Sequence, residues 1–334
     1  MAVVLSLFDG ISCARLAMIE SGLAFDTFVS VEIDPRARQV TSFHFPNTIH
    51  LCDVRRVSYH DGILYYDDEE VVQLKPSSAV VLGGSPCQGF SNAGKGLNFK
   101  DARSKLFFEF ERIVNEIKPR MWLLENVRMK RQWVDVISQR LGRPPVRINS
   151  KFFTPLSRPR IYWCSWDITV PVPTVPLAMR DLFDTTENVE KFNVALSDKA
   201  IAMCHRIVVR AKERGLGYKM PVVTGDDYYL CLDKNIFKGP DGKRGIVDDG
   251  VHPLRMPTPL ECERLQGLPD NYTMFECQGV EMCKTNRFRL IGNAWTVPVV
   301  AFLLKNYQPP MESSEQQRSV VSKNPLPPCN GNAT

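Results

Sequence analysis

One cysteine in the sequence stands in the surroundings of a nucleophile. Cys87 follows a glycine pair, a serine and Pro86, and a polar, glycine-rich loop continues from it to Gly96. Most cysteines are buried apolar fillers. A position after a proline in a polar loop is a poor place for a core residue and a good one for a reactive thiolate. The apolar run over 79–82 is predicted to be a strand that brings Cys87 to the edge of a sheet.

A carboxylate ends the next predicted strand. The apolar run over 121–124 is followed directly by Glu125 and Asn126. Neighbouring parallel strands end at the same edge of a sheet, so Glu125 is predicted to lie beside Cys87. A thiolate and a carboxyl at one edge are the groups of nucleophilic and acid–base chemistry.

Three further strand ends predict a pocket for a nucleotide-like cofactor. The first strand ends in the tight turn Asp9-Gly10, where backbone N–H groups point outward. Glu32 ends the second strand, where a carboxylate can accept from both ribose hydroxyls, and Asp53 ends the third, where it can accept from an adenine amine. For either acid taken alone, a solvated strand end is the favoured interpretation, and only together with the first turn do they describe an adenosine-sized pocket. The later glycines of a dinucleotide fingerprint are missing, which argues against a pyrophosphate and hence against NAD or FAD.

An alternation of strands and helices must position these residues. Strands are predicted at 3–8, 28–33, 48–51, 79–82 and 121–124. Ile11, Leu16 and Ile19 are expected on the buried side of the first helix, and an amphipathic helix from Ser104 is ended by Pro119. Such alternation predicts an α/β fold with a doubly wound, mostly parallel sheet and ligands at the carboxyl ends of its strands.

The texture of the sequence changes after about residue 166, which predicts a second domain. Prolines cluster there and the alternation becomes irregular. We expect a catalytic and cofactor-binding domain over 1–164, a smaller irregular domain over 165–256, a return to the first domain over 257–307 and a disordered tail over 308–334. Thr258 and Pro259 open a capped helix. A strand or turn is predicted at 288–295 and an apolar helix at 297–304.

Composition excludes several classes of protein. The 334 residues carry 42 Lys+Arg and 37 Asp+Glu, a net charge of +5, and 44% are hydrophobic, so wholesale disorder is excluded. No apolar run approaches the roughly 20 residues of a membrane span, and the acidic N-terminus is not a signal peptide. The ten cysteines are scattered without a C-x-x-C pair or zinc spacing, which predicts no metal site and a reducing, intracellular setting.

Taken in order, the motifs resemble those of the DNA cytosine-5 methyltransferases. The resemblance spans roughly residues 3 to 305, with a gap in the variable middle, and its style is that of the animal de novo branch without the regulatory domains of that branch. The usual later glycine of the first motif is missing, and Leu156 replaces a usual glutamine. The matching motifs are Phe8-Asp9-Gly10, Glu32, Asp53, Gly83 to Gln88, Glu125-Asn126-Val127, Arg158-Pro159-Arg160, Glu261 to Pro269 and Gly292-Asn293.

This resemblance implies a fold of the S-adenosylmethionine-dependent methyltransferases and a role for each catalytic residue. Cys87 would add to carbon 6 of a cytosine flipped out of duplex DNA, which makes carbon 5 nucleophilic. Glu125 would bond ring nitrogen 3 and the exocyclic amine, which requires a protonated carboxyl or a shared proton. Arg160, with Arg158, would hold the base and orient Glu125; the competing interpretation of both arginines is a structural ion pair. S-adenosylmethionine would become S-adenosylhomocysteine, and the motifs name no base for the carbon-5 proton.

Binding residues are carried over from the same motifs. The loop after Cys87 is the natural lid, and the segment 165–256 would be the target-recognition domain, although its lysines can equally be solvated loop residues. The expected cofactor contacts are Phe8, Asp9, Gly10, Ile11, Glu32, Ile33, Asp53, Val54, Leu106, Asn293, Ala294 and Trp295, the last of which can also be plain core. The expected DNA contacts are Gln88, Ser91, Asn92, Lys95, Lys100, Lys238, Lys243 and Arg244.

Three competing functions stay open beside the leading one. A transfer-RNA cytosine-5 methyltransferase is disfavoured by the absence of that subfamily's Cys-Phe-Thr tripeptide. A catalytically silent DNA-binding paralogue is disfavoured because Cys87 and Glu125 are both present, and a nicotinamide oxidoreductase by the missing glycines. The leading hypothesis is an enzyme that binds double-stranded DNA as a monomer, with neither metal nor membrane. It would act in a prokaryotic or phage-infected cytoplasm or in a nucleus, and its role, including restriction-modification, stays open.

Overall fold

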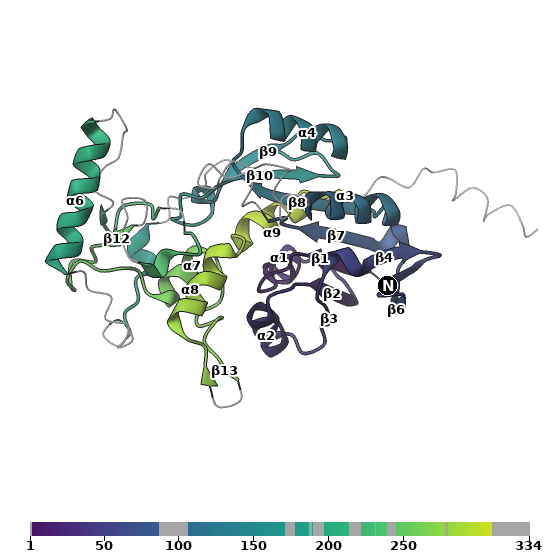
Figure 1. Cartoon of the computed structure of the whole chain (residues 1–334), viewed down its shortest axis with the longest axis horizontal. Coiled ribbons are helices and arrows are strands. Elements are labelled where there is room, and N and C mark those ends of the chain that lie inside the picture. The colour runs from purple at the N-terminus through teal and green to yellow at the C-terminus, as the bar shows by residue number, and fades with distance from the viewer. Residues whose placement is uncertain are drawn as a thin grey trace, which may run out of the picture.

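A seven-stranded, mostly parallel sheet is the centre of the fold (Figure 1). The computed structural model describes residues 2–86, 106–170, 178–186, 189, 197–213, 222–230, 232–238, 245–277 and 280–308. In sheet order the strands are β3 (Ile49–Leu51), β2 (Thr27–Val31), β1 (Val3–Leu7), β7 (Ala79–Gly83), β8 (Met121–Val127), β10 (Pro159–Cys164) and β9 (Val146–Asn149). The first five strands in this order, β3, β2, β1, β7 and β8, are mutually parallel. Strand β10 is antiparallel to both of its neighbours. The predicted α/β fold and mostly parallel sheet are therefore confirmed.

Helices bury both faces of this sheet. Successive residues of a strand point to opposite faces, so Val4 packs with helices α1 (Cys13–Ser21), α2 (Pro35–His44) and α9 (Val297–Lys305). Leu5 packs on the other face with α3 (Leu106–Ile117) and α4 (Arg131–Leu141). Helix α9 packs directly against α1, although the two come from opposite ends of the chain (Figure 1). The segment after 257 thus completes the core that the first residues begin.

Two predicted helix starts are formed as expected. The side chain of Asp34 accepts from the backbone N–H of Arg36, and Pro35 occupies the first turn of α2. Thr258 and Glu261 cap the start of α7 (Pro259–Leu265) reciprocally: each side chain accepts from the backbone N–H of the other. Because these caps satisfy N–H groups that the helix leaves unpaired, they fix where both helices begin.

Two predictions about helices were wrong. Ile19 is 55% exposed, because α1 begins only at Cys13 and buries Ala14, Ala17 and Met18 instead. The stretch 288–295 is not a strand or turn but belongs mainly to α8 (Lys284–Asn293). The polar residues of α8 did not indicate a buried helix. The helix is buried nevertheless, because the guanidinium of Arg287 forms a buried ion pair with Glu263.

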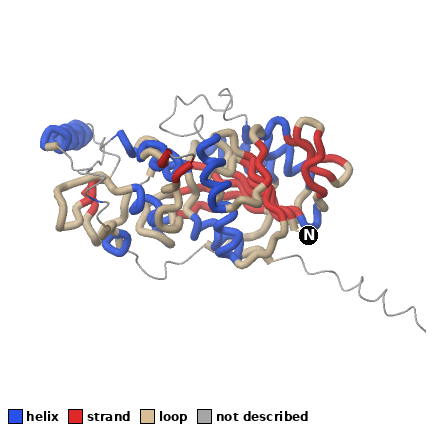
Figure 2. Tube along the Cα trace, turned by 90° about the horizontal axis from the view of Figure 1, so that it is seen from below, coloured by secondary structure: helices blue, strands red, loops and turns tan. Residues whose placement is uncertain are grey.

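Smaller elements lie outside the central sheet. An antiparallel meander of β4 (Val57–His60), β5 (Ile63–Tyr66) and β6 (Glu69–Gln73), which the sequence did not indicate, packs on α3. The irregular middle segment contributes α6 (Asp198–Glu213), β11 (Val222–Val223) and β12 (Ile246–Val247), and β13 (Glu276–Cys277) pairs with β14 (Val280–Glu281). In both views α6 lies at the opposite end of the molecule from the meander (Figures 1 and 2). Residues 309–334 of the expected tail lie outside the described residues.

Helices α8 and α9 together form the one described stretch with the length and hydropathy of a membrane span. Residues Lys284–Lys305 meet both criteria, but 67% of that window is buried inside the fold. The apolar residues of α9 pack on the sheet and on α1. Burial of this kind is typical of core helices.

Buried ion pairs tie α7 to the segments around it. The guanidinium of Arg255, 2% exposed, donates to Glu261 at 2.7 Å and to Asp249 at 2.7 Å. Glu261, another residue of a resemblance motif, is completely buried and also accepts from the backbone N–H of Asp184. Burial opposes ionisation of Asp249, but hydrogen bonds from the His252 N–H and from Arg255 outweigh it and hold the pKa of Asp249 below its ordinary value. These residues therefore join 184, 249–255 and α7 structurally.

We expect Arg255→Met to reduce the free energy of unfolding by about 3–5 kcal/mol, because it leaves Glu261 buried without its counter-ion. The loss is measured by urea unfolding, in which the dependence of the free energy of unfolding on urea concentration should not change. Arg56→Met breaks a half-exposed pair with Asp67 and should cost less than about 1 kcal/mol. Equal losses in both variants would contradict this account of the cluster.

The contribution of Asp249 to stability depends on pH. Since the folded pKa of Asp249 is depressed, its ionised form stabilises the folded state above the unfolded pKa, and this stabilisation is lost as the pH falls below about 4.

Candidate active site

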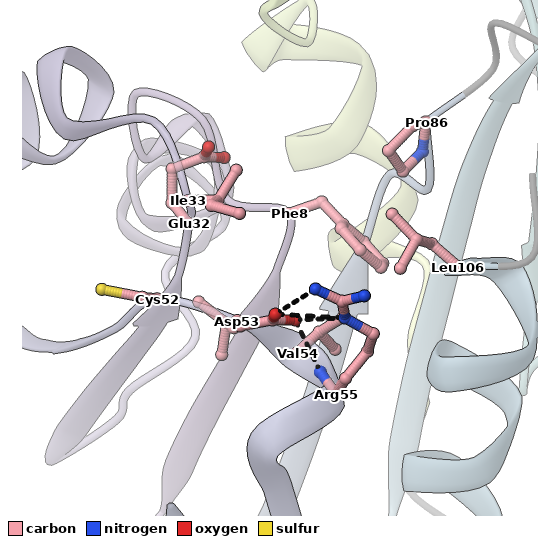
Figure 3. A pocket seen from close by; sticks show the side chains of 10 residues that line it. Phe8, Glu32, Ile33, Cys52, Asp53, Val54, Arg55, Pro86 and Leu106 are labelled. Atoms are coloured by element: carbon pink, nitrogen blue, oxygen red, sulfur yellow. Dashed lines mark hydrogen bonds and ion pairs between the residues drawn. The ribbon is translucent and has the colours of Figure 1, made fainter. Parts of the chain in front are cut away.

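A cavity of about 300 Å³ opens where the predicted cofactor pocket should be, at the carboxyl ends of β1, β2 and β7 (Figure 3). Six predicted cofactor residues line it: Phe8, Glu32, Ile33, Asp53, Val54 and Leu106. Val31, Cys52, Arg55 and Pro86 complete the lining. The strand ends named from the sequence therefore converge on one cavity.

Glu32 holds the turn after β1 in place. The backbone N–H of Gly10 donates to its Oε2 at 2.8 Å, and the N–H of Asp34 donates to its Oε1 at 2.8 Å. Burial raises the pKa of Glu32 above its ordinary value. The turn needs this support because Phe8 and Ser12, both non-glycine residues, have the positive φ values 57° and 58°.

Asp9 serves this turn from inside the core. Its carboxylate accepts hydrogen bonds from the hydroxyls of Ser6, Ser12 and Ser30, and burial raises its pKa. Ile11 is also buried, at 1% exposure. Asp9, Gly10 and Ile11 are not among the residues that line the cavity.

Asp53 is held at the cavity by an arginine that the sequence did not single out. Arg55 donates to Asp53 from its backbone N–H and from its guanidinium, in the fork visible in Figure 3. The hydrogen bonds from Arg55 hold the pKa of Asp53 below its ordinary value, so the carboxylate is ionised at neutral pH. In the sequence, the only sign of the Asp53–Arg55 pair is that the two residues are two positions apart.

The second part of the site is a carboxylate–guanidinium pair on adjacent strands. Nε of Arg160 lies 3.0 Å from Oε1 of Glu125, and both side chains are nearly buried, at 13% and 12% exposure. Strands β8 and β10 pair so that Tyr162 lies opposite Glu125. Strand β7 runs parallel to β8, with Gly83 opposite Leu124, so the expected adjacency of these two strand ends is confirmed.

The turn that leads to Cys87 passes very close to Glu125. A Cβ atom on Gly84 would lie 2.6 Å from Nε1 of Trp295 and 3.2 Å from Oε2 of Glu125. Only glycine permits this approach, because real Cβ atoms do not come within 3.0 Å of other heavy atoms. Cys87 itself, and the predicted lid and DNA contacts Gln88, Ser91, Asn92, Lys95 and Lys100, lie outside the described residues.

Asn126 holds the turn that follows β7 in place, a role that the sequence analysis did not predict. Its Nδ2 donates to Oγ of Ser85 at 3.0 Å and to the carbonyl oxygen of Ser85 at 3.4 Å, and both residues are buried. The signal was present in the sequence, since Asn126 directly follows Glu125. This bond links the end of β8 to the turn that follows β7.

Arg158 makes the structural contacts that were the competing interpretation of this residue. Its guanidinium donates to the carbonyl oxygens of Leu232, Gly292 and Ala294, and the residue is 4% exposed. These bonds join β10 to the middle segment and to the end of α8. The arrangement favours a positioning role, and Arg160 alone of the two pairs with Glu125.

The remaining predicted contacts are distributed around this site. Trp295 lies against Gly84, while Asn293 is exposed and Ala294 is buried, and none of the three lines the cavity. Lys238 is exposed at the end of a short 3₁₀ turn, and Lys243 and Arg244 lie outside the described residues. Among the described residues, no group of three His, Cys, Asp or Glu side chains is placed to hold a metal ion.

Three other cysteines of the described chain lack the features of a nucleophile. Cys13, Cys164 and Cys262 are buried, and burial raises the pKa of each thiol above its ordinary value. A raised pKa keeps a thiol protonated and unreactive. These three are therefore core residues, as expected.

Comparisons with known proteins agree with the motif series. The model of the family described as C-5 cytosine-specific DNA methylase matches residues 2–132 and 183–308. The chain is 26% identical over 332 residues to the type II methyltransferase M1.ScrFI of Lactococcus lactis subsp. cremoris, covering 94% of this chain and 79% of that protein. It is 26% identical over 316 residues to the type II methyltransferase M.NlaX of Neisseria lactamica, covering 89% and 93%. Among solved structures, the Entamoeba histolytica methyltransferase EhMeth shares the fold with a TM-score of 0.66 at 17% identity, covering 91% and 97% of the two chains.

Proposed function

The chain belongs to the C-5 cytosine-specific DNA methylase family, and we propose that it methylates a flipped-out cytosine of duplex DNA through a covalent bond to Cys87. By family and by relatives it is a DNA (cytosine-5-)-methyltransferase, and the methyl donor of such enzymes is S-adenosylmethionine. One observation carries the mechanism. The Glu125–Arg160 pair lies against Gly84, on the turn that runs through Pro86 at the cofactor cavity to Cys87.

The cavity fits the adenosine part of S-adenosylmethionine. Glu32 and Asp53 offer carboxylate oxygens to hydroxyl and amino groups, and Phe8, Ile33 and Leu106 offer apolar surface to a base. Ile33 is 68% exposed, so its side chain is available to a ligand in the cavity. A volume of about 300 Å³ is at the lower end for small-molecule sites. When bound there, S-adenosylmethionine supplies an electrophilic methyl group.

Cys87 makes carbon 5 of the base reactive. Its thiolate attacks carbon 6, the new carbon–sulfur bond forms, and electron density moves to carbon 5, which then accepts the methyl group. Loss of the carbon-5 proton returns the electron pair to the ring and breaks the bond to Cys87. Ser85 and Asn126 support this attack by fixing the turn that carries the thiol.

Glu125 and Arg160 act on the other edge of the base. Glu125 holds ring nitrogen 3 and the exocyclic amine, and a proton shared with nitrogen 3 draws electrons away from carbon 6 as the thiolate attacks. Arg160 orients Glu125 through the contact at 3.0 Å and neutralises it when the proton is given up. Arg158 positions this strand through its three carbonyl partners.

The target must leave the duplex, because carbon 6 is not accessible in a base stack. Unstacking costs a few kcal/mol, which protein contacts to the phosphates and to the vacated space must offset. We assign recognition of the surrounding sequence to 165–256 and the remaining machinery to 1–164 and 257–307. Type II methyltransferases among the relatives support a role in restriction-modification.

One experiment tests the whole proposal. The full chain is incubated with S-adenosylmethionine and plasmid DNA, and 5-methylcytosine is then mapped by bisulfite sequencing. We expect methylation at one short recognition sequence. A chain that methylates transfer RNA but not duplex DNA, or that modifies neither, would overturn the assignment.

Gly84→Ala tests the close approach between the turn and the catalytic pair. The added Cβ would displace the indole of Trp295 and crowd Glu125, so we expect kcat/KM for DNA to fall by about 10- to 100-fold. The thermal midpoint should remain close to that of the wild type. Unchanged activity of Gly84→Ala would mean that the turn tolerates a side chain.

A further inference from the structure

Helix α6 presents one packed side and one open side. It spans Asp198–Glu213 and lies at the end of the molecule farthest from the meander (Figures 1 and 2). Cys204 is completely buried and marks the packed side. Met203 and Val209 are 48% and 55% exposed, so the open side carries apolar as well as charged groups. The cofactor and catalytic residues described above use no part of this helix.

The open side is cationic. Lys199, Met203, Arg206 and Arg210 follow one another at intervals of four, three and four residues, which places them on a single helical face. All four are exposed, and they lie opposite Cys204. At 1.5 Å per residue this α6 cationic face, defined by these four residues, extends over about 16 Å. Its acidic residues, Asp198 and Glu213, stand only at the two ends of the helix.

The three cations of this face lack the partners that other surface arginines have. Arg180 pairs with Asp226, and Arg264 pairs with Asp270. Within the described part of the chain, no carboxylate lies at ion-pair distance from Lys199, Arg206 or Arg210. A run of unneutralised cations on one helix face attracts a polyanion.

We infer that the α6 cationic face binds the phosphate backbone of the DNA that flanks the target cytosine. This inference rests on the proposed function, since the polyanion is the same duplex that the catalytic site engages. The helix belongs to the segment 165–256 but lies at the end of the molecule away from the central sheet (Figure 1). It would therefore contact phosphates that flank the target and not the flipped base. Phosphate contacts carry no sequence information, so the face raises affinity and leaves the recognised sequence unchanged.

The test neutralises the face without disturbing the helix. The triple variant Lys199→Gln/Arg206→Gln/Arg210→Gln removes three cations and keeps residues of similar helix propensity. Binding of the full chain to a duplex of about 40 base pairs is measured by fluorescence anisotropy over a range of salt concentrations. The slope of log K against log salt is negative, and each lost phosphate contact reduces its magnitude by about 0.9. The triple variant should therefore have a slope smaller in magnitude by about 2 to 3.

A control with the same change in net charge separates a local contact from general attraction. Lys75→Gln/Lys118→Gln/Arg120→Gln removes three exposed cations that precede β7 and β8, at the edge of the sheet opposite the cavity. This control should leave the salt slope near that of the wild type. On a duplex of about 12 base pairs, roughly 40 Å long and centred on the target, the α6 variant should also bind like the wild type.

The outcomes distinguish this inference from the proposed function. An unchanged salt slope in the α6 variant, or an equal change in the control variant, would overturn the α6 assignment. The first of these results would instead favour an acidic protein as the partner of the α6 cationic face. The binding assay does not require methyl transfer. A chain that binds duplex DNA through α6 but produces no 5-methylcytosine would therefore contradict the proposed function alone.

Discussion

Replacing Cys87 by alanine is expected to eliminate methyl transfer, with a loss on the order of 10⁴-fold or more in kcat. Without the thiolate, carbon 5 of cytosine is too weak a nucleophile to accept the methyl group. Binding of S-adenosylmethionine and of DNA should persist, because the cavity is lined by other residues. The measurement is incorporation of tritium from labelled cofactor into duplex DNA, with binding of cofactor followed separately by calorimetry.

Trapping of the covalent adduct tests the same residue without relying on turnover. DNA with 5-fluorocytosine at the target has no carbon-5 proton to lose, so wild-type enzyme should remain attached to it and migrate more slowly in a denaturing gel. The Cys87→Ala variant should form no such adduct. Cys283→Ala, at an exposed thiol ahead of α8, should form it as the wild type does. An adduct that survives in Cys87→Ala would assign the attack to another residue.

The second large effect is expected for Glu125→Gln, which should lower kcat by about 10²- to 10⁴-fold. Glutamine keeps the shape of the side chain but can neither share a proton with ring nitrogen 3 nor balance the charge of Arg160. Because the cavity residues are unchanged, KM for S-adenosylmethionine should stay within about twofold. Single-turnover rates with saturating DNA and cofactor give the loss in the chemical step.

Glu111→Gln is a matched control for this substitution. Like Glu125, Glu111 is nearly buried, at 11% side-chain exposure, and pairs with an arginine, here Nε of Arg140 at 2.7 Å. It lies on α3, away from the base-binding edge, so the same chemical change should leave kcat unaltered. Similar losses in both variants would mean that a buried ion pair, and not the chemistry at the base, explains the effect at Glu125.

Local sequence patterns were sufficient to locate the strands of the central sheet, although β8 continues through Glu125 to Val127, beyond its predicted end. Apolar runs that stop at Glu32, Asp53 and Glu125 correspond to β2, β3 and β8, and the acids at the first two line one cavity. The adjacency of β7 and β8 followed from their order in a parallel sheet. These predictions succeeded because a strand in such a sheet is buried on both faces, so its limits are visible in hydrophobicity alone.

Tertiary partners account for what the sequence did not reveal. Asp9 belongs to the cofactor motif but turns into a cluster of three serines, and Arg158 extends to carbonyl groups of residues far along the chain. Helix α8 was missed because Arg287 is polar in sequence yet buried by Glu263. In each case the partner is distant in sequence, so neither periodicity nor spacing could identify it.

The packing of α9 on α1 has a consequence for synthesis of the protein. Val4, Val80 and Leu82 bury one face of the sheet against both helices, but α1 ends at Ser21 and α9 begins only at Val297. At ribosomal rates of about 5–20 residues per second, roughly 15 to 60 seconds separate the emergence of the two helices. During that interval the nascent chain exposes an apolar strand face without its cover. The core that these two helices share can therefore close only after α9 has been synthesised, whereas the last residue that lines the cofactor cavity, Leu106, is synthesised much earlier.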